Sequence, residues 1–264
     1  MGKFILFLAV LSLYASAVGV KSVLAHGETL IPYQRCIVAS TDYAANCSTV
    51  FNASATNPDP YFIADGPVYP TLQMALDECP FSPVMIEIHG TVLASDNLTF
   101  TQNKDLIIRG VRSHRPSKIL RFSNVLVANP GHFIEIENII LEGCNANHSV
   151  FTEDGLTPCV TNHDLIFMNA VVQNYNGSVA ICQHPTECHK HRLVVDCTDF
   201  LNITHTIIDN LNVKYSSIVG SSFCPCSDGT AHCIKLVSTN VESAWDVVDN
   251  KFCAKNNQTI GIYI

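Results

Sequence analysis

The segment Phe133-Ile-Glu-Ile-Glu-Asn-Ile-Ile-Leu-Glu-Gly143 decides the fold that we predict for this chain. Ile134 and Ile136 alternate with glutamates, which is the two-residue period of a β-strand with one buried face. Three similar segments begin at Leu106, Leu165 and Leu193. The four copies are about 30 residues apart, and a near-constant period of this length indicates a repeat architecture.

The repeat is predicted to be a β-solenoid, because each unit contains strand-like runs and no amphipathic helix of the kind that ankyrin, TPR and HEAT repeats need. Stacked coils pair their strands in parallel and bury one continuous apolar column. The predicted register places Ile134 between Leu106 and Leu165, and Ile136 between Ile108 and Phe167. A β-sandwich with accidental spacing is the alternative, and four matched units disfavour it.

The same register predicts a shared corner and two outward columns of side chains. Asn138 and Asn169 occupy the corner, flanked by Gly110 and Cys197, where asparagine tolerates left-handed backbone. The polar column contains Arg109, Glu137, Met168 and Asp196. The other contains Ile107, Glu135, Ile166 and Val194. The second column is too apolar for a fully solvated face, so we expect a loop, the N-terminal segment or a partner to cover part of it.

A short helix is predicted at the beginning of the solenoid. Thr71 can cap a helix that presents Leu72, Ala75, Leu76 and Cys79 on one face and ends at Pro80. Such a helix would close the open end of the coil, as terminal repeats must. The first strand of the solenoid is then expected to begin at Val84.

Several of these segments together carry a family resemblance. The capping helix is followed by Ile86-Glu-Ile-His-Gly-Thr91, Leu98-Thr-Phe100 and Asp105-Leu-Ile-Ile-Arg-Gly-Val111. This succession resembles the opening of the pectin lyase-like right-handed parallel β-helix superfamily, over roughly residues 65–219. The resemblance implies an all-β, right-handed parallel β-helix. It does not imply one activity, since the superfamily includes lyases, hydrolases, esterases, tailspikes and inert surface proteins.

The N-terminus resembles a secretory signal peptide. Positive charge at Lys3 precedes a ten-residue apolar run at 4–13 and the small residues Ala15-Ser-Ala17. We therefore predict a signal peptide at 1–17, an N-terminal extension at 18–64 and the β-helix domain at 65–264. A cut after Ala25 and an uncleaved anchor are the alternatives. No later run reaches the length of a membrane span, so the mature chain is expected to be secreted or surface-associated.

Composition narrows the classes of partner. The net charge is −8 and no basic patch appears, so nucleic acid is not an expected partner. Twelve cysteines in a secreted chain indicate disulfides, with Cys36 and Cys47 expected to staple the N-terminal segment. The others are Cys79, Cys144, Cys159, Cys182, Cys188, Cys197, Cys224, Cys226, Cys233 and Cys253. Of these, Cys182 and Cys188 bracket a predicted loop tip, as do Cys224, Cys226 and Cys233.

Seven sequons are candidate sites for N-linked glycans, and none has proline at its middle position. They are Asn46, Asn52, Asn97, Asn147, Asn176, Asn202 and Asn257. If several of them carry glycans, little bare surface is left for a broad protein-binding face.

Four residues are candidates for catalysis. The segment from Asp164 to Asn174 is similar to the pectin methylesterase motif, which implies Asp164 as nucleophile. Met168 replaces the family's glycine, and no match to the oxyanion-hole motif occurs, which puts esterase chemistry in doubt. Glu137 and Asp196 lie two coils apart, about 10 Å, within the range for glycoside hydrolysis. Arg109 beside Glu137 favours a structural ion pair instead.

No metal or cofactor is predicted. His184, His189 and His191 lie near Cys182 and Cys188, and these are zinc-ligand types. In a secreted chain the two cysteines are expected to be oxidised, so no metal site is assigned. The carboxylate cluster that a Ca²⁺-dependent lyase requires is not found in the sequence.

Two functional hypotheses follow. The first is a non-catalytic extracellular or surface protein that binds glycans or builds a wall, coat or matrix. The second is a polysaccharide-active enzyme: a lyase, a glycoside hydrolase or a pectin esterase. A cleft with converging acids on the outward face would favour the enzyme, and a flat or glycan-shielded face would favour the binder. A naked strand invites pairing, so the strand-like end at residues 260–264 is expected to fold back as a cap, to meet another subunit in self-association, or to mark the sequence as a fragment.

Overall fold

The computed structural model describes residues 35–39, 66–81, 83–94, 98–100, 104–111, 116–122, 125–127, 133–146, 150–153, 163–226, 232–237, 244–254 and 260–263. Internal contacts divide the chain into Met1–Tyr33 and Gln34–Ile264. Every described residue belongs to the second unit. Among the described residues, no helix has the length and apolar character needed to cross a membrane.

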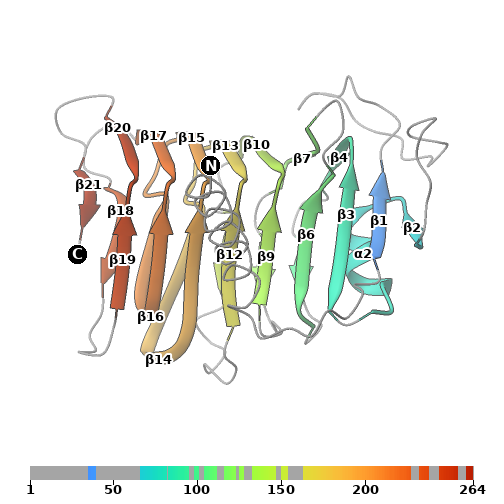
Figure 1. Ribbon diagram of the computed structural model, residues 1–264, viewed down its shortest axis with the longest axis horizontal. Coiled ribbons are helices and arrows are strands. Elements are labelled where there is room, and N and C mark those ends of the chain that lie inside the picture. The colour runs from blue at the N-terminus through green and yellow to red at the C-terminus, as the bar shows by residue number, and fades with distance from the viewer. Residues whose placement is uncertain are drawn as a thin grey trace, which may run out of the picture. The chain divides into compact units, whose positions relative to one another are not determined.

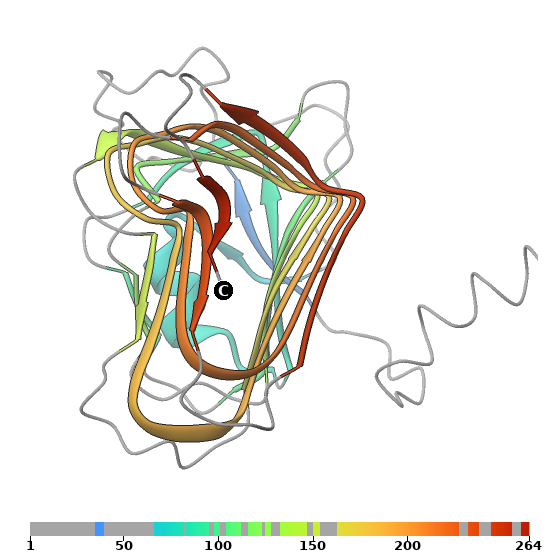
Figure 2. The same cartoon turned by 90° about the vertical axis from the view of Figure 1, so that its left-hand side faces the viewer.

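The second unit is a parallel β-helix with three faces (Figures 1 and 2). The first face contains β3 (Val84–His89), β6 (Leu106–Gly110), β9 (Phe133–Glu137), β12 (His163–Met168), the later parts of β14 (Ala180–Asp196) and β16 (Ile208–Val219), and β19 (Ala244–Val248). The second contains β4 (Thr91–Leu93), β7 (Lys118–Leu120), β10 (Ile140–Ala146), β13 (Val171–Tyr175), β15 (Asp199–Ile203), β17 (Ser222–Cys226) and β20 (Lys251–Ala254). The third contains β5 (Thr99–Phe100), β8 (Val125–Val127), β11 (Phe151–Glu153), the earlier parts of β14 and β16, β18 (His232–Val237) and β21 (Ile260–Tyr263).

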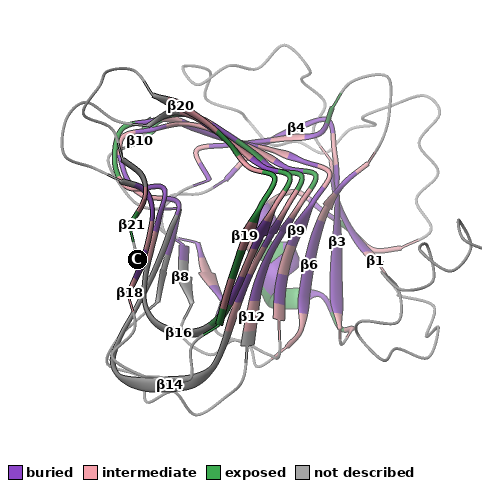
Figure 3. Cartoon of the chain, turned by 60° about the vertical axis from the view of Figure 1, so that its left-hand side comes forward, coloured by how far each residue is buried: buried purple, intermediate pink, exposed green. Residues whose placement is uncertain are grey.

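The described strands make up seven successive coils, as the seven-stranded second face shows. The strands β14 and β16 run from the third face into the first without a break, and Figure 3 shows both bends. The prediction of a loop tip between Cys182 and Cys188 is therefore wrong, because both residues lie within β14. The strand continues through this segment because it pairs with β16 on both sides of a register shift.

The predicted register is confirmed. Leu106 pairs with Ile134, and Ile134 pairs with Leu165. Phe167 lies opposite both Ile136 and Val195 on its two neighbouring strands. These inward side chains are buried, so each coil adds one layer to a continuous apolar column.

Phenylalanine rings continue this column through the last four coils. The ring centroids of Phe167 and Phe200 are 6.3 Å apart, and those of Phe200 and Phe223 are 4.9 Å apart. Phe223 stacks in turn on Phe252 at 5.3 Å. Aromatic pairs at these separations add about 0.5–1.5 kcal/mol each beyond the burial of their area.

The corner between the first and second faces is built from left-handed residues, as predicted for Asn138 and Asn169. Their φ angles are 52° and 50°, and Cys197, Gly220 and Asp249 continue the ladder at 47°, 58° and 55°. Backbone hydrogen bonds connect successive corners; for example, the Asn169 N–H donates to the Asp196 carbonyl at 3.0 Å. Figure 3 shows this corner as a row of largely exposed positions.

The first coil is closed by helix α2 (Leu72–Glu78), as predicted. The Thr71 side chain accepts a hydrogen bond from the Met74 N–H at 3.2 Å, and Leu72, Ala75 and Leu76 are buried. Beside the helix, β1 (Arg35–Ala39) pairs on one edge with β3 and on the other with β2 (Val68–Tyr69). The strand β1 lies within the predicted extension, whose boundaries at residues 17 and 64 stay predictions.

The disulfides are not the short-range bridges across loops that the spacing of the cysteines suggested. Cys36 bonds to Cys79, and Cys224 bonds to Cys253 in the adjacent coil. Cys144 and Cys233 are also disulfide-bonded. The prediction that Cys197 is paired is wrong: its thiol is free and exposed at the left-handed corner. The reason is the stacking, because the equivalent corner positions above and below are Asn169 and Gly220.

Five predicted disulfide cysteines remain untested. Cys47 and Cys159 lie outside the described residues. Cys182, Cys188 and Cys226 lie in strands, but their side chains are outside the described part.

Candidate functional site

The candidate site is the outward side of the first face, where the sequence places all four catalytic candidates. The predicted polar column is confirmed, since Arg109 pairs with Glu137, Glu137 with Met168, and Met168 with Asp196. Glu87 extends it by one coil, because Glu87 lies opposite Arg109. The column therefore brings acids and arginines together along one line.

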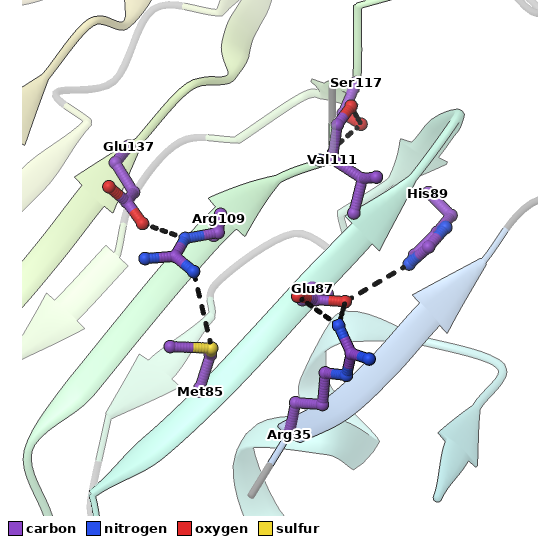
Figure 4. A network of polar contacts seen from close by, with 8 residues as sticks. All are labelled: Arg35, Met85, Glu87, His89, Arg109, Val111, Ser117 and Glu137. Atoms are coloured by element: carbon purple, nitrogen blue, oxygen red, sulfur yellow. Dashed lines mark hydrogen bonds and ion pairs between the residues drawn. The ribbon is translucent and has the colours of Figure 1, made fainter. Parts of the chain in front are cut away.

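Arg35, Glu87 and His89 form the first cluster of this face (Figure 4). The Arg35 Nη1 donates to both carboxylate oxygens of Glu87 at 3.0 Å, and His89 Nε2 lies 3.5 Å from Glu87 Oε2. Contact with His89 and the hydrogen bond and charge of Arg35 lower the pKa of the nearly buried Glu87, against the opposing effect of burial. The sequence did not reveal this cluster, because β1 was not predicted as a strand.

Arg109 and Glu137 form the second cluster. The Arg109 Nε donates to Glu137 Oε1, and its Nη1 lies 4.0 Å from the sulfur of Met85 (Figure 4). Glu137 is only 9% exposed, so its charge is compensated by the guanidinium rather than by water. The predicted structural ion pair is confirmed.

Asp164 and Arg192 form the third cluster, on a further outward column that the Ile107–Ile166 column separates from Glu137. Asp164 Oδ2 accepts from Arg192 Nε at 3.0 Å and from Arg192 Nη2 at 2.5 Å. Phe133 lies opposite Asp164 on one side, and Tyr215 lies opposite Arg192 on the other. The candidate nucleophile is thus bound by a guanidinium, and the Asp164–Arg192 pair lies between Phe133 and Tyr215 in the register.

Asp196 stands apart from these pairs. Met168 separates it from Glu137 in the register, so the two candidate acids belong to different local environments. Asp196 accepts a hydrogen bond from the Cys197 thiol, which is the main cause of the raised pKa of that thiol; burial and the negative charge of Asp196 add to it. The described arrangement does not bring Glu137 and Asp196 together over a common space.

The apolar outward column is buried in its first coils. Ile107 is 5% exposed and Ile166 is 2% exposed, and neither belongs to the inner core cluster. The expectation that this face is partly covered is therefore confirmed. Farther along the stack the face opens, since Tyr215 and Val248 are exposed.

A further polar cluster, missed by sequence reasoning, surrounds Glu142 on the second face. Its buried carboxylate accepts from the Cys144 N–H and from the side-chain amides of Gln173 at 2.7 Å and Asn174 at 2.9 Å. The available signal was the register, which places Glu142 opposite Gln173. Because these hydrogen bonds hold the turn, this cluster is structural in character.

Two of the seven sequons fall within the described residues. The exposed Asn202 donates from Nδ2 to Asn174 Oδ1 at 2.8 Å, and Asn176 donates from Nδ2 to the Asn145 carbonyl at 3.1 Å. The remaining five lie outside the described part of the chain: Asn46, Asn52, Asn97, Asn147 and Asn257.

Within the described residues, no group of three or more His, Cys, Asp or Glu side chains could hold a metal ion. His184, His189 and His191 lie in β14, with side chains outside the described part. No family model, curated protein or solved structure matches the chain. The function must therefore be argued from the arrangement of its own residues.

Proposed function

We propose that this chain is a secreted, non-catalytic β-helix protein that binds neutral glycans on the outward side of its first face. The observation that carries the proposal is the pairing of the face's acids with arginines. Glu87 contacts Arg35, Glu137 contacts Arg109, and Asp164 contacts Arg192. The expected kinship with the pectin lyase-like superfamily is part of this proposal.

These ion pairs work against hydrolytic chemistry. A glycosidase needs one carboxyl group that stays protonated and a second that acts as base or nucleophile. A guanidinium bonded to a carboxylate occupies oxygen atoms that a substrate or its proton would need. Asp164 is the clearest case, because Arg192 donates two hydrogen bonds to one of its oxygens.

The same ion pairs suit the binding of a neutral sugar. We assign the ligand surface to the open part of the face, comprising Phe133, Asp164, Arg192 and Tyr215, and call it the Tyr215 surface. Tyr215 is 37% exposed, and a tyrosine ring offers an apolar face with a polar tip. The neighbouring Asp164–Arg192 pair has no net charge and still offers hydrogen-bond donors and acceptors. Such groups match the hydroxyl groups of a neutral sugar better than the carboxylates of an acidic one.

Binding and turnover should be measured together on one panel of neutral and acidic polysaccharides, by affinity electrophoresis and by reducing-sugar and unsaturated-product assays. We expect retardation by neutral polymers without product formation. Tyr215→Ala should weaken binding by about tenfold or more, because stacking is lost, whereas Tyr215→Phe should retain most of it. Met74→Ala, which shortens an exposed side chain on α2, is the control. Clear turnover in these assays would replace this proposal with the hydrolase or lyase alternative, and methanol release from methyl-esterified pectin that Asp164→Asn abolishes would replace it with the esterase alternative.

Secretion, glycosylation and self-association complete the proposal. The disulfides Cys36–Cys79 and Cys224–Cys253 suit an oxidising, extracellular setting, and the N-terminal sequence supports export. A structural role in a coat or matrix requires contacts between copies. We place those contacts at the C-terminal end of the coil stack, where β19, β20 and β21 each pair with one described strand.

A further inference from the structure

Five of the seven sequons fall at one corner of the coil, where a strand of the second face leads into the next strand of the third face. We call it the second–third corner. Asn202 lies near the end of β15, and Asn176 directly follows β13. In chain order Asn97 lies between β4 and β5, Asn147 between β10 and β11, and Asn257 between β20 and β21. The last three lie outside the described residues, so the order of the strands alone places them.

The backbone alone does not account for these asparagines. Asn202 has a φ of 53°, a left-handed angle that asparagine tolerates, but Asn176 has no positive φ. At the corner between the first and second faces, Asn169 has a φ of 50°. There Val171 stands two residues later, where a sequon needs serine or threonine. The hydroxyl residue that completes each sequon is therefore a feature of the second–third corner that turn geometry does not require.

Asn202 presents its side-chain amide to solvent. Asn202 and Thr204 are both exposed, and the Thr204 N–H donates to the Tyr175 carbonyl on the neighbouring coil. The Asn202 Nδ2 donates to Asn174 Oδ1 at 2.8 Å, which uses one of the two N–H groups of the amide. A glycan replaces the other hydrogen: Nδ2 bonds to C1 of the first sugar, the C1–O bond to a lipid diphosphate donor breaks, and Nδ2 releases a proton. The fold therefore accommodates a glycan at Asn202 without losing the bond to Asn174.

We infer that N-linked glycans line the second–third corner and leave the outward side of the first face bare. The inference rests on the glycosylation proposed above and specifies where the glycans lie. A three-sided coil places this corner opposite the first face, as the view along the stack in Figure 2 shows. None of the seven sequon asparagines lies within the bounds of a first-face strand. The glycans thus shield the second and third faces, while a ligand still reaches the Tyr215 surface.

The first experiment maps the occupied sequons. The full chain is produced in a secreting eukaryotic cell, and its peptides are deglycosylated by an amidase in water enriched in heavy oxygen, which marks each formerly glycosylated asparagine by mass. We expect the mark at Asn202 and at one or more of Asn97, Asn147 and Asn257. Any other pattern overturns the inference, including an unmarked Asn202 or marks confined to Asn46 and Asn52.

The second experiment isolates Asn202 without altering its side chain. Thr204→Ala removes the sequon, so we expect the intact protein to lose the mass of one glycan. Thr204→Ser is the matched control and should keep that glycan, because serine also completes a sequon. Far-UV circular dichroism checks that both variants fold. An unchanged mass in the alanine variant shows that Asn202 carries no glycan and overturns the inference.

The third experiment tests whether the first face is bare. Removing the glycans enzymatically from the folded protein should leave its retardation by neutral polysaccharides unchanged, and altered retardation overturns this part of the inference. If neither form is retarded, glycan binding fails, while the map of occupied sequons still decides where the glycans lie. If the chain is not exported by its own N-terminus, a secretory leader in place of residues 1–17 delivers it for the same map. Failure of export then counts against secretion alone.

Discussion

Cys36 on β1 is bonded to Cys79 at the end of helix α2, with their Cα atoms 6.1 Å apart and both residues fully buried. The bond joins positions 43 residues apart and holds the first strand of the sheet against the cap. The closure of the N-terminal end of the stack therefore depends on a covalent contact that spans the polar segment between them.

Removing this disulfide should destabilise the protein. We expect Cys36→Ser combined with Cys79→Ser to lower the free energy of unfolding by about 2–4 kcal/mol, because the crosslink restricts the unfolded chain. Urea unfolding followed by circular dichroism measures the change. Cys197→Ser is the control and should stay within about 0.5 kcal/mol, since that thiol is free and exposed. Equal losses in the two variants would contradict the assigned role of the bond.

The Arg109–Glu137 pair should show strong coupling. Arg109→Ala leaves the nearly buried Glu137 carboxylate without its partner, so we expect a loss of about 1–3 kcal/mol in the free energy of unfolding. Adding Glu137→Gln to Arg109→Ala should recover part of that loss, because a neutral amide tolerates burial better than an unpaired charge. A double-mutant cycle by urea denaturation measures the coupling, and strictly additive losses would contradict it.

Glu87 should make the N-terminal coil sensitive to acid. Its pKa is lower in the folded chain than its ordinary value of 4.5, so its stabilising contribution is present above that value. The contribution is lost as the pH falls through the lowered pKa, because the folded state must then take up a proton. Glu87→Gln should flatten this part of the stability curve, measured as the urea midpoint between about pH 6 and 3. An unchanged slope would show that other carboxylates dominate.

The left-handed corner should prefer asparagine or glycine. Asn169 has a φ of 50°, so Asn169→Ala is expected to cost about 1 kcal/mol of unfolding free energy, whereas Asn169→Gly should cost less. Thermal unfolding of the two variants side by side tests the difference. If alanine and glycine behave alike, the backbone angle does not determine the residue preference at this corner.

The sequence was most informative where apolar and polar residues alternate strictly along a strand. The pattern around Ile134 and Ile136 predicted the register, the corner asparagines and the Arg109–Glu137 pair, because a two-residue period and a parallel stack leave few other arrangements. It was less informative for β1, a five-residue strand with no copy at the repeat spacing. That strand is positioned by Cys79 and Glu87, contacts that a local pattern does not contain.

The amino-acid sequence by itself determined that the chain stacks short parallel strands around an apolar column and that a capped helix closes its beginning. Those properties follow from side-chain periodicity and capping, which are local. Tertiary structure alone decided which cysteines pair and which arginines compensate Glu87 and Asp164. These depend on distances between residues from different coils, and small changes in loop length between coils alter them without changing the repeat.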